Sequence, residues 1–260
     1  MNLPMQTAME LMVEDPELLE SIRALPTEDE LPCDDGEPME TPQHRDQMML
    51  LIQSLKLHWA DRRGYYIGGN MFLHFDPDNP RRFRGPDFFL ALDVAERERK
   101  SWVVWYEGMR FPDVIIELLS DSTRNIDKGE KKVLYERVFR TQEYYLYDPF
   151  SQEFFGYHLH RLRYRRRRPD AEQKIYSPVT DLYLAVRDGH LRWQTEAGVV
   201  LPTPEEHAER TERRFERERL RAEQAQQQAE QAQQQAEQER LRAEQAEAIL
   251  EEYRRRFGSL

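Results

Sequence analysis

The chain has 260 residues and a formal net charge of −11 at pH 7, and 33% of its residues are charged. A single cysteine, Cys33, excludes an internal disulfide and a cysteine-rich zinc site. A mean hydropathy of −0.88, without any long apolar run, excludes a membrane-spanning helix. The acidic balance argues against nonspecific coating of nucleic acid, but it allows an enzyme that binds nucleic acid through one local patch and a metal ion. No secretory signal begins the chain, so we expect a cytoplasmic protein without membrane contact.

Composition divides the chain into three regions. Residues 1–36 are acidic and rich in proline, which is typical of an extended arm with little capacity to bury a core. Residues 37–202 are rich in aromatic and strand-forming residues, with turn signals between short apolar runs, and we expect them to form the globular domain. In residues 203–257 Gly and Pro almost vanish and Ala, Glu, Gln and Arg take over, which predicts a long helix.

The globular region contains both helix and strand signals. Thr41 is a suitable N-cap for a first helix, in which His44, Met48, Leu51 and Leu55 follow at helical spacing on one face. A second helix is predicted over 127–139. Apolar and aromatic runs predict strands over 65–75, 86–94, 113–120, 143–149 and 153–159. This order of elements predicts an α/β core.

The C-terminal region contains an internal repeat. Glu218–Ala225 recurs at Glu239–Ala246, a displacement of 21 residues or three heptads. With Ala222 in position a, alanine fills most of the a and d positions as far as 246, and Leu250 follows, which predicts a coiled coil and a homodimer. About 50 helical residues would span roughly 75 Å, and the small alanine side chains predict weak association. The alternative is a single helix stabilised by ion pairs four residues apart.

One carboxylate lies within a run of apolar residues. Glu117 sits in "PDVIIELLS", between Val114 and Leu118, and a glutamate is rarely buried without a partner. A metal-dependent nuclease needs oxygen ligands for Mg²⁺, and carboxylates on neighbouring strands, ~4.8 Å apart, can bind one ion. Asp113 lies four residues earlier on the same strand, about 13 Å away, which is too far to share an ion. Asp87 begins a different strand, so Asp87 and Glu117 are the predicted metal ligands.

The cation that assists such a site is not on the same strand. Leu119 occupies the position, two residues after the strand carboxylate, at which many metal-dependent nucleases have a lysine. On the following predicted helix, Lys131 shares a face with Tyr135 and Val138, whereas Lys132 lies on a solvated face. A lysine on an apolar face needs a buried anionic partner, so we predict that Lys131 supplies the displaced cation. The alternative is that its side chain extends past Tyr135 to water.

Four segments together resemble the Uma2 family of restriction-endonuclease-like proteins. They are "LPCDDGEPMETPQHRDQMMLLIQSL", "YIGGNMF", "FRGPDFFLAL" and "WVVWYEGMRFPDVIIELLSDSTRNIDKGEKKVLYERVFRTQEYYLYDP". The resemblance covers about residues 30 to 200 and is dense from 84 to 149. It implies the PD-(D/E)xK nuclease fold, a mixed central sheet flanked by helices, with the lysine moved from the strand to the following helix. We therefore expect a restriction-endonuclease-like domain over 37–202, followed by the coiled-coil helix over 203–257.

The resemblance also implies an activity. Asp87 matches the aspartate of the family's "PD", Glu117 its strand glutamate, and Lys131 the lysine four residues before the tyrosine of "KxxxY". The implied reaction is hydrolysis of phosphodiester bonds in DNA by a hydrolase that depends on Mg²⁺ or Mn²⁺. Asp87 and Glu117 would hold the ion, Lys131 would support the attacking water, and the Leu119 backbone carbonyl is a further candidate ligand.

The segment that leads into the first helix adds two weaker candidates. By resemblance to the family, Glu40 or Glu37 would be an extra acidic ligand, and His44 would orient water or phosphate. A lone histidine on an inward helix face is more often a core residue than a catalyst.

Two functions from different classes remain open on the sequence alone. The first is the metal-dependent endonuclease, and the second is a catalytically silent nuclease-fold scaffold that works through its coiled coil. The arginine cluster Arg161–Arg168, "RLRYRRRR", is equally compatible with a phosphate-binding patch and with a solvated hairpin loop.

Overall fold

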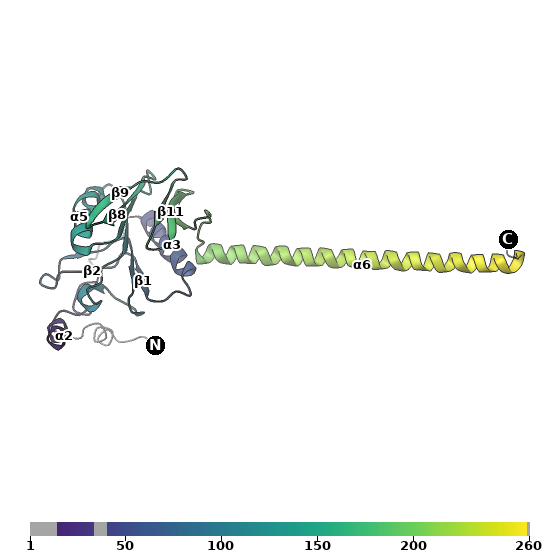
Figure 1. Cartoon of the computed structure of the whole chain (residues 1–260), viewed down its shortest axis with the longest axis horizontal. Helices are drawn as coiled ribbons and strands as arrows, with labels where there is room; N and C mark the ends of the chain where they lie inside the picture. The colour runs from purple at the N-terminus through teal and green to yellow at the C-terminus, as the bar shows by residue number, and fades with distance from the viewer. Residues whose placement is uncertain (1–14, 34–40, 259–260) are drawn as a thin grey trace. The chain divides into compact units, whose positions relative to one another are not determined.

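The computed structural model describes residues 15–33 and 41–258. The chain divides into two compact units, residues 1–204 and 205–260, and each is described by itself (Figure 1). The first unit is a mixed α/β structure, as the sequence predicts. The second consists of the long helix α6 (Pro204–Phe257), 54 residues in length, while its coiled-coil pairing stays a prediction. None of the described helices combines the length and the apolar character that a membrane crossing requires.

A mixed six-stranded sheet forms the centre of the first unit. Its strands follow the order β1, β4, β6, β7, β8, β9, in which β6 and β7 are parallel neighbours and the other pairs are antiparallel. The strands are β1 (Tyr65–Gly68), β4 (Phe88–Leu92), β6 (Val114–Leu118), β7 (Glu143–Tyr147), β8 (Phe154–His160) and β9 (Arg163–Arg167). All five residues of β6 and of β7 are buried, which explains their nearly continuous apolar and aromatic sequences.

Two smaller sheets complete the unit. One contains β10 (Lys174–Ser177), β11 (Leu182–Arg187) and β12 (His190–Gln194), and the other contains β3 (Phe83–Arg84), β2 (Leu73–His74) and β5 (Trp102–Val103). The predicted strand over 65–75 is therefore two strands, β1 and β2, in different sheets. A two-residue turn joins β11 to β12, with φ of 50° at Asp188 and 75° at Gly189, which is the left-handed geometry that Asp-Gly favours.

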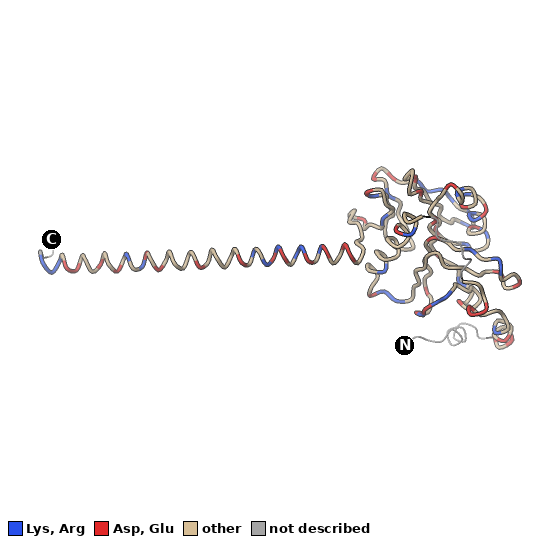
Figure 2. The backbone as a smooth tube through the Cα atoms, turned by 180° about the vertical axis from the view of Figure 1, so that it is seen from behind, with Lys and Arg blue, Asp and Glu red and all other residues tan. Residues whose placement is uncertain are grey.

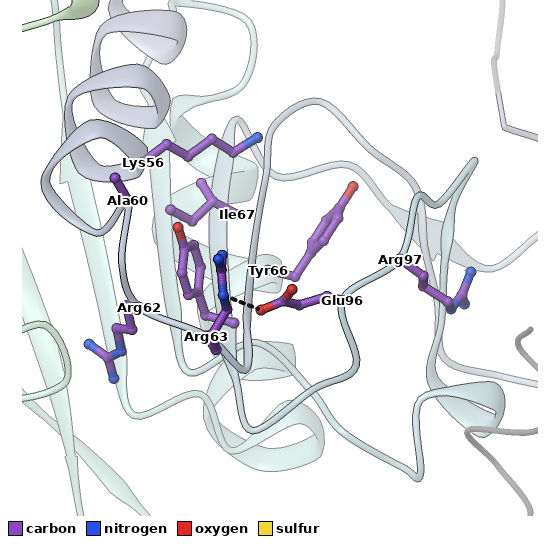
Figure 3. A pocket seen from close by; sticks show the side chains of 9 residues that line it. Lys56, Ala60, Arg62, Arg63, Tyr66, Ile67, Glu96 and Arg97 are labelled. Carbon is purple, nitrogen blue, oxygen red and sulfur yellow. Dashed lines mark ion pairs between the residues drawn. The ribbon is translucent and has the colours of Figure 1, made fainter. Parts of the chain in front are cut away.

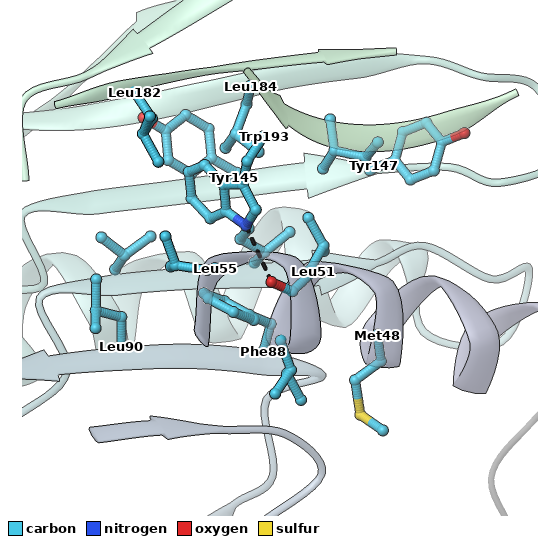
Figure 4. Close-up of a cluster of buried hydrophobic side chains, with 14 of the residues drawn as sticks. Met48, Leu51, Leu55, Phe88, Leu90, Tyr145, Tyr147, Leu182, Leu184 and Trp193 are labelled. Carbon is cyan, nitrogen blue, oxygen red and sulfur yellow. Dashed lines mark hydrogen bonds between the residues drawn. The ribbon is translucent and has the colours of Figure 1, made fainter. Parts of the chain in front are cut away.

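Helix α3 (Pro42–His58) packs on one face of the six-stranded sheet. Thr41 is its N-cap, and the Thr41 side chain accepts a hydrogen bond from the backbone N–H of His44, as predicted. Leu51 and Leu55 are fully buried in the cluster that α3 forms with β4, β6 and the β10–β12 sheet (Figure 4). Trp193 of β12 donates its indole N–H to the Leu51 carbonyl at 3.2 Å, which joins the smaller sheet to this helix.

The helix over Arg124–Phe139 packs on the opposite face, and it is not a regular α-helix. It consists of α4 (Arg124–Ile126), the π-helical turn η2 (Asp127–Lys131), α5 (Lys132–Leu134) and a second π-helical turn, η3 (Tyr135–Phe139). In a regular α-helix, the residue seven positions after Lys131 would return to the same face. A π-helical turn contains more residues than an α-helical turn, so here the residue eight positions later, Phe139, lies on that face. The prediction that Val138 faces inward is therefore wrong: Val138 is 48% exposed and Phe139 is buried instead.

The N-terminal segment is less extended than its composition predicts. Helix α2 (Pro16–Arg23) is capped by Asp15, and Ile22 and Leu31 are buried in a cluster with Trp105 and Tyr106. These two aromatic side chains also donate hydrogen bonds to carbonyls of the same segment. Residues 15–33 thus pack against the globular unit, although they are acidic.

Candidate active site

Two carboxylates meet across neighbouring strands at one edge of the sheet. Phe88 of β4 pairs with Ile116 of β6 in an antiparallel register, so Asp87 and Glu117 occupy the next opposed pair. Asp87 Oδ2 accepts a hydrogen bond from the Leu118 backbone N–H at 2.7 Å, which fixes its carboxylate beside β6. The side chain of Glu117 is 1% exposed, while Asp87 keeps part of its surface open to solvent. The structure thus places the predicted pair on adjacent strands.

The backbone behind Asp87 is held by the "GGN" segment that follows β1. Asn70 donates its backbone N–H to the Pro86 carbonyl at 2.9 Å. A Cβ atom on Gly69 would lie 2.7 Å from the Asp87 carbonyl oxygen and equally close to the Ile52 side chain. Only glycine allows this approach, so the sequence "YIGGN" serves to position Asp87.

Lys131 lies directly over Glu117. Its Nζ is 3.1 Å from Glu117 Oε1 and 2.8 Å from Asp127 Oδ1, and the Tyr135 hydroxyl donates a hydrogen bond to Glu117 Oε1 at 2.9 Å. The Asp127 side chain is 1% exposed and that of Lys131 is 15% exposed. These contacts form one network from β4, β6 and the Arg124–Phe139 helix, with Asp87 at its solvent side.

The network is short of positive charge. Burial raises the pKa of Glu117 to about 8 and that of Asp87 to about 6. The neighbouring carboxylate of Asp127 adds to both increases, and Lys131 opposes them without cancelling them. Burial alone would lower the pKa of Lys131, but Glu117 and Asp127 more than offset this effect and hold it above its ordinary value. Lys131 therefore stays an ammonium ion, and with Asp87, Glu117 and Asp127 ionised the site would need two further positive charges to be neutral.

A divalent cation fits this deficit in both charge and ligand type. Mg²⁺ prefers carboxylate oxygens and is commonly bound through one or two carboxylates together with water. Asp87 and Glu117 provide such oxygens, whereas Asp127 is engaged by Lys131. Within the part of the chain that the structure describes, no group of three or more His, Cys, Asp or Glu side chains is arranged as a metal cluster. A pair of carboxylates suits an ion that keeps most of its water ligands.

Two residues of this network were not selected from the sequence. Asp127 and Tyr135 lie four residues before and four residues after Lys131, on the same face of the helix. The spacing of Asp127 and Lys131 is a recognisable signal for an ion pair. Tyr135 enters the sequence analysis as part of an apolar face and as the tyrosine of "KxxxY", without a role at the site, although a buried tyrosine hydroxyl normally needs a hydrogen-bond partner.

The remaining predicted residues lie elsewhere or have other contacts. Asp113 accepts hydrogen bonds from the Leu92 backbone N–H and from Gln142, at the far end of β6 from Glu117. His44 is buried, with its ring Nδ1 2.7 Å from Thr41 Oγ1, and its catalytic role stays a prediction.

Two other predictions concern backbone and undescribed positions. The Leu119 backbone N–H donates to the Tyr147 carbonyl at 2.7 Å, and the role of the Leu119 carbonyl as a metal ligand stays a prediction. Glu40 and Glu37 fall outside the described residues.

A separate cleft of about 370 Å³ does not contain the carboxylate pair (Figure 3). It opens beside the first residues of β1, which pair with the last residues of β4, whereas Asp87 precedes the first residue of β4. Its lining includes Lys56, Arg62, Arg63 and Glu96, and Arg63 Nε is 3.7 Å from Glu96 Oε1. The cleft therefore lies at the opposite end of these strands from the network around Glu117.

Comparison with known proteins places the chain in a family. The profile described as "Uma2: Putative restriction endonuclease" matches residues 17–187, which include Asp87, Glu117, Asp127 and Lys131. The chain belongs to the Uma2 family. Membership of Uma2 supports a nuclease-like function, with nucleic acid as the substrate. The match begins within α2 and ends at the last residue of β11, so it spans most of the first unit.

A solved structure is also similar to part of the chain. It is a crystal structure of a "putative nuclease belonging to DUF820" from Anabaena variabilis ATCC 29413, with 20% sequence identity and a TM-score of 0.41. The similarity covers 63% of this chain and 89% of that chain. No curated protein sequence matches the chain.

Proposed function

We propose that this Uma2 protein is an endonuclease that hydrolyses phosphodiester bonds in DNA with the help of Mg²⁺ or Mn²⁺. The observation that carries the proposal is the convergence of Asp87, Glu117 and Lys131 in one network whose carboxyl groups outnumber its cation. Family membership supports a nuclease, and three carboxyl groups beside a single ammonium group support a divalent ion.

Each residue of the network has a distinct task in this proposal. Asp87 and Glu117 would hold the ion, with the Leu119 carbonyl as a further ligand. When bound, the ion would supply a water of lowered pKa and neutralise charge on the phosphate. Lys131 remains an ammonium ion, so it does not act as a base. Instead it orients the attacking water and stabilises the negative charge of the pentacovalent phosphate.

The residues around Lys131 hold it in place for this task. Its Nζ contacts both Glu117 and Asp127, so two carboxylates from different elements fix one ammonium group. The Tyr135 hydroxyl uses the same oxygen of Glu117, Oε1, as Lys131 does. The second oxygen of Glu117 is therefore the one available to an ion on the Asp87 side.

A plasmid-nicking assay tests the proposal. Supercoiled DNA is incubated with Mg²⁺ or Mn²⁺ and the wild type, Asp87→Asn, Lys131→Met or the control Asp113→Asn, which changes the aspartate of the other "PD" pair. We expect the wild type and the control to nick DNA, and both site variants to be at least 100-fold slower, which is a typical loss for a catalytic electrostatic group. Equal cleavage by all four proteins would reveal a contaminating nuclease, and no cleavage by the wild type would contradict the proposal.

We further propose that α6 pairs with a second copy of the chain as a coiled coil. No described residue of α6 is buried in the single chain. The a and d positions defined by Ala222 also include Phe215, which is 67% exposed, and Tyr253, which is 66% exposed, so aromatic layers flank the alanine layers. A dimeric nuclease would present two sites to the two strands of a duplex.

Sedimentation equilibrium tests this pairing. Ala229→Lys with Ala232→Lys places charge on the a and d positions, whereas Gln227→Lys with Gln234→Lys places the same charge on the outer f positions. We expect the wild type and the outer variant to be dimers, and the seam variant and a chain ending at residue 203 to be monomers. Dimers of the shortened chain would contradict the role of α6. A dimer that neither binds metal nor cleaves DNA would favour the scaffold function instead.

A further inference from the structure

The arginine cluster "RLRYRRRR" is a strand at the edge of the six-stranded sheet. Arg161 and Leu162 form the turn after β8, with φ of 46° and 67°, and the cluster then continues as β9, which pairs with β8 on one side and ends the sheet on the other. The four consecutive arginines 165–168 are all exposed. The predicted solvated hairpin is therefore present, although most of the cluster is its second strand and not a loop. Strand geometry divides the arginine side chains between the two faces of the sheet.

The acidic net charge of the chain hides a basic globular region. Residues 1–40 carry 12 Asp and Glu against one Arg, whereas residues 41–204 carry 26 Lys and Arg against 23 Asp and Glu, a formal charge of +3. Figure 2 marks these residues along the backbone in blue and red. The argument from net charge against nucleic-acid binding thus applies to the N-terminal segment and not to the region that contains the candidate active site.

Three cations, two from the Arg124–Phe139 helix and one from β9, gather on the helix-covered face of the sheet. Arg166 of β9 lies over the Phe155 ring, 4.2 Å from its centre, and Lys128 Nζ of η2 lies 5.2 Å from the same centre. Lys132 Nζ lies 4.8 Å from the centre of the Tyr157 ring, which neighbours Phe155 on that face. We call Lys128, Lys132 and Arg166 the basic surface. The rings hold the cationic groups near one another, although like charges repel.

Few carboxylates neutralise the positive charges of the basic surface. Lys128 Nζ is 3.4 Å from a carboxylate oxygen of Glu153, and both side chains are about one-third to one-half exposed, so solvent screens this pair. Among the described residues, Lys132 and Arg166 have no carboxylate partner within 4 Å. Two positive charges therefore remain available to an anion from solution.

The basic surface lies in register with the candidate active site. Glu117 of β6 pairs with Leu146 of β7, and Leu146 pairs with Phe155 of β8, so Glu117 and Phe155 are two strands apart. This corresponds to about 10 Å at ~4.8 Å per strand. Phosphates of one DNA strand follow one another about every 3.4 Å along the helix axis. The separation of Glu117 and Phe155 is short enough for the basic surface to contact a phosphate within a few nucleotides of the one cleaved at Glu117.

We propose that the basic surface binds the phosphate backbone of duplex DNA and positions it for cleavage at the Asp87–Glu117 site. This inference rests on the proposed nuclease function and assigns the surface that receives its substrate. A different role, protection of an edge strand against pairing with another sheet, would require charges on β9 alone. It does not account for Lys132, which lies on the helix and over the Tyr157 ring, next to the Phe155 ring that Arg166 covers.

Fluorescence anisotropy with a labelled 20-base-pair duplex in EDTA tests the proposal without any cleavage. We compare the wild type with Lys132→Gln/Arg166→Gln, with the charge-preserving Lys132→Arg/Arg166→Lys, and with the control Arg213→Gln/Arg240→Gln, which removes two exposed cations from α6. We expect the first variant to raise Kd at least tenfold at moderate salt and to lower the slope of log Kd against log salt by about 2, one unit per lost phosphate contact. The charge-preserving variant and the control should bind as the wild type does.

The possible outcomes distinguish a failure of the proposed DNA-binding surface from a failure of the proposed nuclease function. Binding by the Gln variant that equals wild-type binding overturns the surface, even if the plasmid assay shows cleavage. Loss of binding in that variant supports the surface, even if the wild type cleaves nothing. Lys132→Gln alone should weaken binding, and an unchanged Kd would overturn the shared role of helix and strand. Tighter wild-type binding to single-stranded DNA or to RNA of equal length would overturn the assignment to duplex DNA.

Discussion

Replacing Glu143 by glutamine should remove one pH-dependent contribution to folding stability. Glu143 begins β7 and is 2% exposed, and its Oε2 accepts hydrogen bonds from the Tyr145 hydroxyl at 3.0 Å and from Ser177 Oγ at 2.5 Å. Its Oε1 accepts from the Val179 backbone N–H at 3.0 Å. One carboxyl group therefore joins the six-stranded sheet to β10 and the loop after it. Burial raises the pKa of Glu143 to about 7, these hydrogen bonds oppose the increase, and Asp113 adds to it.

The magnitude follows from the two protonation states. In the unfolded chain Glu143 has its ordinary pKa of 4.5, so between pH 4.5 and 7 the folded state holds a proton that the unfolded state releases. The free energy of unfolding therefore falls as pH rises, by about 1.4 kcal/mol per pH unit, or about 3 kcal/mol over this interval. The stabilisation is fully present below pH 4.5 and is lost as pH rises through 7. Glutamine has no such proton, so the variant lacks this contribution.

Urea unfolding between pH 4.5 and 7.5 measures this contribution. The wild type, Glu143→Gln and the control Glu196→Gln, which changes an exposed glutamate, are compared at one protein concentration with EDTA present. The stability of Glu143→Gln relative to the wild type should increase by about 3 kcal/mol from the lowest to the highest pH. The control should follow the wild type. A constant difference between Glu143→Gln and the wild type would show that Glu143 is ionised in the folded state and would refute the reasoning.

Two further predictions concern the active-site network. Gly69→Ala should destabilise the fold by about 1–3 kcal/mol, because the new Cβ would lie 2.7 Å from the Asp87 carbonyl oxygen. Gly129→Ala on the Arg124–Phe139 helix, where a Cβ meets nothing within 4 Å, should be neutral or slightly stabilising in the same urea titration. Tyr135→Phe should cost about 1 kcal/mol through the lost hydrogen bond to Glu117, and a wild-type unfolding curve for this variant would contradict the bond.

Local signals in the sequence predicted much of the frame of the site. The N-cap Thr41 and the apolar run around Glu117 identified α3 and β6, and the "PD" before a second apolar run identified Asp87 as the residue across from Glu117. The sequence signals for these elements are local, because capping and strand patterns depend on neighbouring residues. The family resemblance independently selected Asp87 and Glu117, together with Lys131.

The irregular parts of the site were less predictable. The periodicity argument assumed regular α-helical turns, and it failed at Val138 because two π-helical turns realign the helix face. Such turns depend on packing against the sheet, which a single sequence does not reveal. Asp127 is the exception, because its spacing of four residues from Lys131 is a signal that the sequence does contain.

The β10–β12 sheet was also missed, although its sequence contains a signal. Asp188-Gly189 between two apolar segments is a strong indication of a hairpin, and the structure has a two-residue turn there. The N-terminal segment shows the opposite error, because its acidic composition masked Ile22 and Leu31, which are buried against the globular unit. Average composition therefore underestimates how well a segment can pack when its few apolar residues share one surface.

Calorimetric titration with Mn²⁺ tests the central claim most directly. The claim is that Asp87 and Glu117 together form a divalent-metal site beside Lys131. The wild type and the control Asp113→Asn should bind the ion with the same affinity, and Asp87→Asn and Glu117→Gln should each bind it at least tenfold more weakly, since each loses an anionic ligand. Absence of Mn²⁺ binding by the wild type, or wild-type affinity in Glu117→Gln, would contradict the account.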